Sequence, residues 1–314
     1  MKVFITGGAG FVGSHVVDRL IGENEIVVYD NLSSGERSFI QKHEGSKNFT
    51  FIEGDLIDRP LLEKSIKGSD AVYHFAANPD IRYGIEYTDT DLTQGTIATY
   101  NVLEAMRLAD VKKIIFSSSS VVYGEPHQFP TSEDYGPMLP ISLYGASKLA
   151  CEGLITSFSH TFGITSWIFR FANIIGKRQT HGLLVDLIAK LDKNKTVLPV
   201  LGDGLQEKSY LYIDDCIDGI LYAVGHANES MNVYNLSAGD QISVSEIVSI
   251  FAKKYTEMTH SQFEISYENK SRGWQGDVVK VKLDAAKINS LGWSARYSSK
   301  RAIEKTVEDL LGGA

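Results

Sequence analysis

The chain has 314 residues, of which 43% are hydrophobic and 10% aromatic, as in an ordinary soluble globular protein, and this length is comfortable for two packed domains. Its 31 basic and 39 acidic residues give a net charge of −8, which argues against a nucleic-acid partner. No apolar run approaches the length that spans a membrane. The first residues run straight into a glycine turn and leave no room for a signal peptide, so we expect a cytoplasmic protein.

The first predicted strand, residues 3–5, leads directly into a glycine turn with the spacing Gly8-x-Gly10-x-x-Gly13, and residues 14–20 then show helical periodicity. This order of strand, glycines and helix is typical of a dinucleotide-binding turn, because the glycines allow close backbone approach and the helix N-terminus receives a pyrophosphate. A glycine turn without a ligand is the alternative interpretation.

A second predicted strand, residues 26–29, ends in Asp30, which stands twenty residues after Gly10. A carboxylate at this place would bind the ribose diol of an adenosine. It would also repel a 2′-phosphate, and residues 31–34 bring no arginine to bind one. The sequence therefore favours NAD over NADP as the cofactor.

Predicted strands and helices go on alternating through residue 170, which indicates a doubly wound parallel sheet. Asp55 follows the third strand and could bind the adenine amino group. His74 lies inside the fourth strand and is expected to be a core histidine rather than a catalyst. The remaining predicted elements of this half are strands at 49–52, 71–77, 113–116 and 166–170 and an amphipathic helix at 99–109.

Four serines, residues 117–120, follow the predicted strand at 113–116, where ligands bind in parallel sheets. Tyr144 and Lys148 lie four residues apart on one face of a predicted helix, so the phenol and the ammonium can address one site. For a tyrosine to act as a base near neutral pH, its pKa of about 10 must fall by roughly three units, or about 4 kcal/mol. One positive charge at ~4 Å supplies about that much at an effective dielectric of about 20. Lys148 is therefore predicted to lower the pKa of Tyr144.

After residue 170 the pattern loosens. A strand is predicted at 210–213, a helix at 183–191, a second helix capped by Asp214-Asp215 and running to 224, and a third at 243–255. Ser243 and Glu246 have the capping-box spacing at the start of the third. We predict a NAD-binding domain at 1–172 with a returning segment at about 208–239. Residues of about 173–207 and 240–314 then form an intertwined substrate-binding domain.

The two cysteines, Cys151 and Cys216, show no metal-ligand spacing and lie in apolar, helix-like surroundings. We expect buried, reduced thiols and no metal site.

Taken together, these motifs resemble the extended short-chain dehydrogenase/reductase family, and within it the NAD-dependent nucleotide-sugar epimerases. The resemblance covers essentially the whole chain and is greatest to the UDP-glucose (UDP-galactose) 4-epimerases of archaeal and thermophile type. It is carried by the glycine turn, residues 30–35, Gly54-Asp55-Leu56, His74-Phe75-Ala76-Ala77, the serine run with Tyr123-Gly124, and Tyr144-x-x-x-Lys148. It implies a Rossmann-type sheet with a smaller, intertwined C-terminal α/β domain, NAD as cofactor, a UDP-sugar substrate and a homodimer.

The resemblance also implies roles for individual residues. Tyr144 would be the base, Lys148 would bind the nicotinamide ribose, and Ser119 would hydrogen-bond the reacting 4′-hydroxyl. The implied cofactor contacts are Gly7, Gly8, Gly10, Phe11, Val12, Gly13, Asp30, Asn31, Ser33, Ser34, Gly35, Asp55, Leu56, Phe75, Ala76, Ala77, Ser117, Ser118, Tyr144, Lys148 and Phe171. The implied substrate contacts are Asn78, Arg82, Ser119, Ser120, Tyr144, Asn173, His181, Gly182, Leu183, Val185, Lys208, Tyr210, Arg272 and Asp277.

The sequence departs from the family pattern at four places. Gly95 stands where an asparagine usually supports the active site, and Lys177 where a proline commonly follows Gly176. Lys208 stands where an arginine is usual, and Trp274 where an arginine usually holds the diphosphate, with Arg272 two residues earlier. Lysine lacks the two-pronged donor of arginine, so the diphosphate contacts are the part of the pattern that these changes affect most.

The expected reaction is a transient oxidation at C4 of a nucleotide sugar, in which a 4-keto sugar turns over and is reduced on its other face. A dehydratase or decarboxylase on the same scaffold is the nearest alternative, but it would need a carboxylate where Ser120-Val121 stands. A non-catalytic NAD-binding regulatory protein is an alternative of a different class. In the 4-epimerases that the chain resembles, the residue at the place four after Asp277 lines the pocket beside the sugar's 2-position, and here that residue is the small Val281. We therefore expect N-acetylated sugars to be accepted as well; the alternative is that Trp274 or another bulky group fills the same space.

Overall fold

The computed structural model describes residues 1–312 except 269, 271, 272, 274, 275 and 277. The predicted site residues Arg272 and Asp277, and the departure at Trp274, lie outside the described residues. The chain forms two compact units. The first comprises Met1–Val122, Ser142–Arg170 and Ile220–Tyr234, and the second comprises Tyr123–Ile141, Phe171–Gly219 and Asn235–Ala314.

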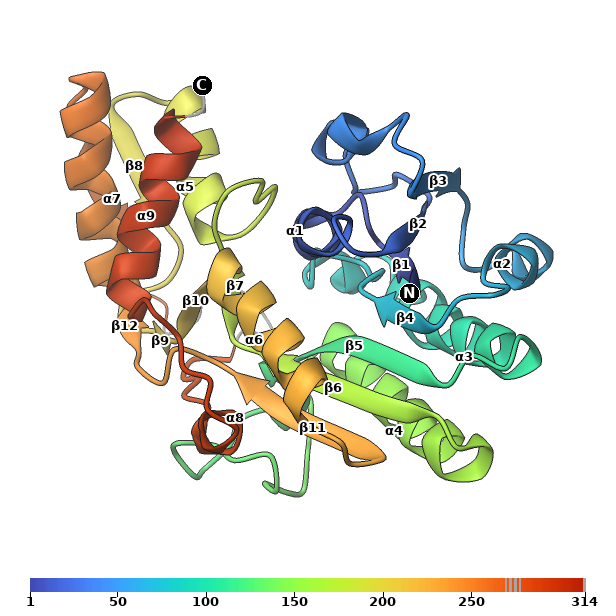
Figure 1. Cartoon of the computed structure of the whole chain (residues 1–314). Coiled ribbons are helices and arrows are strands. Elements are labelled where there is room, and N and C mark those ends of the chain that lie inside the picture. The colour runs from blue at the N-terminus through green and yellow to red at the C-terminus, as the bar shows by residue number, and fades with distance from the viewer. Residues whose placement is uncertain (269, 271–272, 274–275, 277, 313–314) are drawn as a thin grey trace. The chain divides into compact units, whose positions relative to one another are not determined.

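The first unit is built on a seven-stranded sheet with the strand order β11-β6-β5-β4-β1-β2-β3 (Figure 1). The pairs β1–β2, β2–β3, β1–β4 and β4–β5 are parallel, and the order reverses between β1 and β4. This arrangement confirms the predicted doubly wound sheet, and ligands bind such sheets at the reversal point. The strands are β1 Lys2–Thr6, β2 Glu25–Asp30, β3 Phe49–Glu53, β4 Ala71–His74, β5 Lys113–Ser119, β6 Thr165–Phe171 and β11 Met231–Leu236.

Four helices of the first unit are α1 Phe11–Leu20, α2 Arg59–Ser65, α3 Ala98–Leu108 and α4 Leu143–Phe162, with α3 packed against both α2 and α4 (Figure 1). Helix α4 begins where the Ser142 hydroxyl accepts a hydrogen bond from the Gly145 N–H, and it ends at Gly163, whose φ is +65°. Apolar residues from the strands, α3 and α4 pack into one buried core, as a sheet covered by helices requires. A π-helical segment, Leu92–Ile97, leads into α3, and 3₁₀ turns occur at Arg37–Phe39, Gln41–His43, Tyr83–Ile85 and Ser120–Tyr123.

The second unit contains three two-stranded sheets: β7 Asn173–Ile175 with β10 Tyr210–Tyr212, β9 Glu207–Lys208 with β12 Ile242–Ser243, and β8 Val197–Val200 with β13 Glu264–Tyr267. Its helices include α5 Leu183–Lys193, α7 Val244–Thr259, α8 Ala286–Ser290 and α9 Ser299–Gly312, and α7 and α9 lie side by side (Figure 1). Helix α6 Ile213–His226 begins in this unit. The predicted capping box is confirmed, since Ser243 and Glu246 each bond the other's backbone.

The bounds of the two units differ from the division made on the sequence. Residues 123–141 group with the second unit because the Asn235 backbone N–H donates to Glu133 Oε1 (2.7 Å) and the Asn235 amide donates to the Thr131 carbonyl (2.9 Å). Residues 208–219 also group there, so the segment that returns to the first unit is 220–234.

Two local predictions are wrong. The strand predicted at 71–77 ends at His74. The helix predicted to be capped by Asp214-Asp215 begins instead at Ile213. Asp215 cannot act as the cap, because its carboxylate accepts from the backbone N–H groups of Arg296 and Tyr297 and pairs with the Arg296 guanidinium at 2.7 Å.

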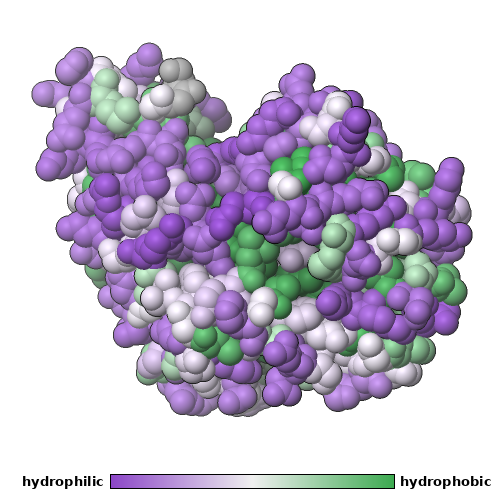
Figure 2. All heavy atoms as spheres, viewed as in Figure 1, coloured by the Kyte–Doolittle hydropathy of each residue, from purple (hydrophilic) through white to green (hydrophobic). Residues whose placement is uncertain are grey.

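Polar residues cover most of the face seen in Figure 2, with apolar side chains in smaller patches. Both cysteines are buried free thiols, as predicted. In the described part of the chain, no helix has the length and apolar character needed to cross a membrane.

Candidate active site

The glycine turn joins β1 to α1 at the point where the strand order reverses. Gly7 has a φ of +68°, and a Cβ added to it would lie 2.6 Å from the Ala76 backbone N. A Cβ on Gly13 would collide with the Gly7 carbonyl oxygen. Both positions therefore need glycine. Gly10 caps α1 without a side-chain hydrogen bond, so the first backbone N–H groups of the helix can receive an anion.

Asp30 ends β2 beside this turn. Its Oδ2 accepts from the Ala9 N–H and its Oδ1 from the Leu32 N–H, both at 2.9 Å. Burial raises the pKa of this carboxyl, and the two backbone hydrogen bonds oppose that rise. The Asn31 amide donates to Asp55 Oδ2 at 2.9 Å, which ties the segment after β2 to the segment after β3. Residues 31–36 return over the turn, where the Glu36 N–H donates to the Ala9 carbonyl.

These predicted cofactor residues therefore come together in the first unit, and they fit a dinucleotide. The turn leaves room for backbone contact with a diphosphate, and Asp30 lies where a ribose diol would be bound. Phe75 and Ala76 continue from β4 against the turn, with their N–H groups bonded to the Thr6 carbonyl (3.1 Å) and hydroxyl (3.4 Å). Small residues at 76 and 77 leave space along this edge.

Lys148 is buried on α4, one turn after Tyr144, and its Nζ donates to the Ser117 carbonyl at 2.7 Å. The same Nζ lies 5.6 Å from the centroid of the Tyr144 ring and 4.8 Å from that of Phe116. The structure thus places Tyr144, Lys148 and the serine run together. Burial lowers the pKa of Lys148 to about 8, while negative charge from Cys151, Asp91 and Glu152 opposes that fall.

The predicted lowering of the Tyr144 pKa by Lys148 is wrong for the chain by itself. Burial raises the pKa of Tyr144, and the charges of Asp91 and Cys151 raise it further. The physical reason is desolvation, because burial disfavours the charged phenolate. The Lys148 ammonium itself bonds a backbone carbonyl of β5 and lies 5.6 Å from the centroid of the tyrosine ring.

The four serines have different surroundings. Ser118 is buried, and its hydroxyl donates to Glu152 Oε1 at 2.5 Å, so a cofactor contact from Ser118 is left to its backbone. Ser119, the last residue of β5, is partly exposed, and its hydroxyl accepts from the Val121 N–H at 3.4 Å. Ser120 begins the 3₁₀ turn and is buried. Of the two serines predicted to bind substrate, Ser119 has the more accessible side chain.

His74 is a core histidine, as predicted. It is fully buried, with Nδ1 2.6 Å from the Thr6 hydroxyl and Nε2 2.9 Å from the Thr99 hydroxyl. Burial lowers its pKa to about 3, so the ring is neutral at physiological pH and joins β1, β4 and α3 through hydrogen bonds.

The predicted substrate residues Asn78 and Arg82 lie in the loop after β4. The Asn78 amide donates to the Asp80 carbonyl (2.9 Å) and to Asp91 Oδ1 (3.1 Å). The Arg82 guanidinium contacts both carboxylate oxygens of Asp80, at 3.1 and 3.2 Å. Both side chains thus hold the shape of this loop.

Asp91 was missed by the sequence reasoning, although it is a buried carboxyl whose charge acts on Tyr144 and Lys148. Its carbonyl accepts from the Ser147 hydroxyl at 2.7 Å. Its Oδ2 has no hydrogen-bond partner among the described residues, and burial raises its pKa. No spacing rule signals this residue, because its partners are far away in sequence.

The departure at Gly95 has a structural explanation. A Cβ at this position would collide with the Ser147 hydroxyl, which also lies 3.0 Å from the Thr96 hydroxyl. The serine beside Lys148 therefore occupies the space next to Gly95, inside the π-helical segment.

In the second unit, the pairing of β7 with β10 sets Asn173 opposite Tyr210. The Asn173 amide donates to the Ser209 carbonyl at 3.1 Å, next to Lys208 on β9. His181 and Gly182 immediately precede α5, whose first turn carries Leu183 and Val185. Lys177, a departure, makes an exposed ion pair with Asp214 at 3.4 Å.

Val281 is buried, and its backbone N–H donates to the Glu207 carbonyl at 3.0 Å. This hydrogen bond places Val281 beside the strand that carries Lys208. Phe171 is buried at the end of β6.

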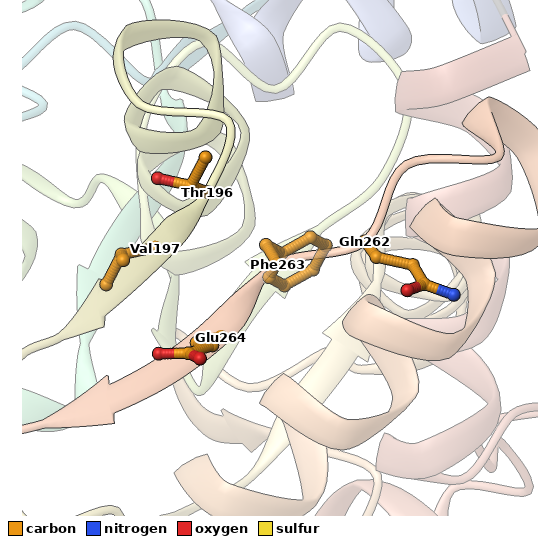
Figure 3. A pocket seen from close by; sticks show the side chains of 5 residues that line it. All are labelled: Thr196, Val197, Gln262, Phe263 and Glu264. Atoms are coloured by element: carbon orange, nitrogen blue, oxygen red, sulfur yellow. The ribbon is translucent and has the colours of Figure 1, made fainter.

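A separate pocket of about 420 Å³ lies where β8 and β13 begin (Figure 3). It contains none of the residues that the sequence predicts to bind cofactor or substrate. Its lining residues are Thr196, Val197, Gln262, Phe263 and Glu264.

Comparisons with known proteins show which family and which solved structures the chain is similar to. Residues 3–237 match the NAD dependent epimerase/dehydratase family. The chain is 30% identical to the UDP-glucose 4-epimerase of Mycolicibacterium smegmatis over 316 residues, covering 98% of each chain. It is also similar to the crystal structure of UDP-glucose 4-epimerase with UDP-glucose from Thermotoga maritima, with a TM-score of 0.88, 31% identity, and coverage of 100% of this chain and 99% of that chain.

UDP-glucuronic acid 4-epimerase from Bacillus cereus, in complex with UDP-glucuronic acid and NAD, gives a TM-score of 0.88 at 28% identity over 100% of both chains. These relatives act on different sugars and share the scaffold described above. The family match covers most of the chain, and the glycine turn at the sheet's reversal point and the Tyr144–Lys148 pair are consistent with it. The chain therefore belongs to the NAD dependent epimerase/dehydratase family of extended short-chain dehydrogenases/reductases.

Proposed function

We propose that this protein is a UDP-glucose/UDP-galactose 4-epimerase that uses NAD. The observation that supports this most is the grouping of Tyr144 and Lys148 on α4 with the serines at the end of β5, where Lys148 bonds the Ser117 carbonyl at 2.7 Å. Ser120-Val121 bring no carboxylate to this strand end, so the acid–base pair of a dehydratase is missing from it.

In this proposal Tyr144 takes the proton of the substrate's 4′-hydroxyl while C4 is oxidised. Bound NAD supplies the redox chemistry, as acceptor and then donor of a hydride. Tyr144 returns the proton after the 4-keto sugar has turned its other face toward the cofactor, so neither a proton nor a hydride is consumed overall. Ser119 hydrogen-bonds the reacting oxygen, and the Lys148 ammonium holds the nicotinamide ribose.

We propose that Asn173 and Lys208 hold the substrate's diphosphate and that His181 to Val185 pass near the uracil. The hydrogen bond of the Asn173 amide to Ser209, next to Lys208, supports a shared role for these two side chains. Binding energy from the nucleotide then positions a sugar carbon that these residues never touch. We also propose that the protein is a homodimer, as the family resemblance implies. The mass of the intact particle in solution tests this.

The sugar range is proposed to include UDP-N-acetylglucosamine and UDP-N-acetylgalactosamine. Excluding an acetamido group requires a clash, and the small Val281 side chain offers little to clash with.

The test is incubation of the protein with a panel of UDP-sugars, with C4 configuration followed by NMR. Interconversion of UDP-glucose and UDP-galactose that Tyr144→Phe abolishes would support the proposal. Turnover of a UDP-hexuronate alone, or loss of water or carbon dioxide from any substrate, would replace it with one of the other reactions of this family.

A further inference from the structure

A buried ion pair lies behind the catalytic face of α4. The Arg170 guanidinium on β6 contacts both carboxylate oxygens of Glu152, with Nη2 2.7 Å from Oε2 and Nε 3.0 Å from Oε1. The two side chains are 6% and 7% exposed. Neither residue was predicted to take part in function.

Glu152 also contacts the serine run. Its Oε1 accepts from the Ser118 hydroxyl at 2.5 Å. One helical turn earlier, the Lys148 Nζ donates to the Ser117 carbonyl at 2.7 Å. Successive turns of α4 therefore bind successive residues of β5, and the next residue of β5 is Ser119.

Packing alone does not require charges at this place. Removing two ions from water is costly, and well-packed apolar residues of similar volume are often as stable or more so. An apolar pair could not accept a hydrogen bond from the Ser118 hydroxyl, and it would not carry charge near Lys148. The ion pair is thus suited to orienting a strand end, with Arg170 fixing the carboxylate that Ser118 meets.

We propose that Glu152, held by Arg170, is a positioning residue that fixes Ser118 and thereby the places of Ser119 and Lys148 relative to Tyr144. This inference rests on the proposed epimerase function. In an extended strand, the direction of one side chain determines that of the next, so a fixed Ser118 restricts where the Ser119 hydroxyl can lie. Reactions of this kind lose rate when catalytic groups shift by as little as about 1 Å.

The charge of Glu152 also acts on Lys148. The titratable groups around this lysine include Tyr144, Cys151 and Glu152 on α4, Asp91 ahead of α3, and His74 on β4, whose own pKa the lysine lowers. Negative charge on Glu152 raises the pKa of Lys148 against the effect of burial. Removing that charge should lower the pKa of Lys148 further below about 8.

The first test compares Ser118→Ala with Ser159→Ala. Ser159 is a matched control, because it is a buried serine of α4 whose hydroxyl donates to Ser166 on β6 at 3.1 Å. We expect Ser118→Ala to lower kcat about tenfold or more with KM and bound NAD little changed, and Ser159→Ala to keep the wild-type kcat. Equal kcat in both variants would overturn the proposal.

The second test uses Glu152→Gln and Glu152→Asp, and it does not depend on turnover. The pKa of the Lys148 ammonium is followed by NMR of the labelled lysine side chains, together with the alkaline limb of the kcat profile where an active substrate is known. Glu152→Gln should move the lysine pKa and the alkaline limb to lower pH. Glu152→Asp should keep both at their wild-type positions, because it keeps the negative charge. A lysine pKa unchanged in Glu152→Gln would contradict the inference.

If Glu152→Gln does not fold, Ser118→Ala and Glu152→Asp still test whether Glu152 positions the serine run. Glu152→Asp keeps the charge but shortens the side chain, so we expect a wild-type lysine pKa with a reduced kcat. A wild-type kcat in both variants would show that Glu152 acts only in folding. Wild-type protein that turns over no UDP-sugar would overturn the proposed function, whereas the NMR titration would still report on the link between Glu152 and Lys148.

Discussion

The ammonium of Lys148 lies 2.7 Å from the carbonyl oxygen of Ser117, so a backbone group of β5 sets the position of the lysine on α4. The pKa of the Tyr144 phenol is nevertheless raised in the chain by itself, because burial disfavours the phenolate and the charges of Asp91 and Cys151 add to that effect. The helix thus brings Tyr144 and Lys148, the two groups proposed to be catalytic, to the strand end that carries the serines.

Tyr144→Phe is expected to keep the fold and NAD binding and to lose activity by about 10²-fold or more, because it removes the proton acceptor and little volume. Epimerisation rate, NAD content and melting temperature are measured on the same preparation. Activity within tenfold of wild type would remove Tyr144 from its proposed role.

Lys148→Met is expected to abolish most activity without lowering stability at neutral pH, because it replaces a buried cation by an apolar side chain of similar length. Burial places the pKa of Lys148 at about 8, below its ordinary value of 10.5. Between these values the unfolded chain binds more protons than the folded one, so the contribution of this lysine makes wild-type stability rise with pH. Lys148→Met should lack that rise in urea titrations between pH 8 and 10.5. The same slope in both proteins would contradict the lowered pKa.

Asp30→Ala is expected to weaken NAD binding and to reduce the difference in affinity between NAD and NADP, since it removes the carboxylate that repels a 2′-phosphate. Dissociation constants for both cofactors, measured by calorimetry on cofactor-free protein, provide the comparison. The exposed Asp110, which pairs with the nearby Lys112, supplies Asp110→Ala as a control. Equal wild-type affinity for the two cofactors would show that Asp30 does not read the ribose.

Gly95→Ala is expected to destabilise the fold by about 1–3 kcal/mol, because the new Cβ would collide with the Ser147 hydroxyl. The hydroxyl cannot easily move away, since it donates to the Asp91 carbonyl at 2.7 Å. Combining the change with Ser147→Ala removes the colliding atom and should recover part of the loss, so the two effects are non-additive. Urea unfolding of both single variants and the double variant measures the coupling. Strict additivity would mean that the helix shifts and the collision does not occur.

Val281→Tyr is expected to remove activity on the N-acetylated UDP-sugars and to leave activity on UDP-glucose and UDP-galactose, because a ring would fill the space left for an acetamido group. The measurement is kcat/KM on both sugar pairs in wild type and variant. If the wild-type protein turns over UDP-glucose and UDP-galactose well but does not turn over the N-acetylated pair, another group already fills this space.

Much of this protein could be predicted from local patterns. The glycine turn, Asp30 after β2, the Tyr144–Lys148 spacing and the Ser243–Glu246 capping box all follow from helix and strand periods that act over a few residues. The sheet could be predicted as well, because buried parallel strands appear as short apolar runs and right-handed connections restrict their order. Burial of His74 followed from its place inside such a run.

Only the tertiary structure determined which groups meet across elements. Glu152 reaches Arg170 on β6 and Ser118 on β5, and Asp91 meets Asn78 and Ser147. No short-range period links these positions, so no spacing rule could find them. The pKa of Tyr144 likewise depends on burial and on the charges of Asp91 and Cys151. Desolvation and the directions of side chains arise from packing between elements, and for this reason the pKa values of Tyr144 and Lys148 could not be predicted from the four-residue spacing that identified this pair.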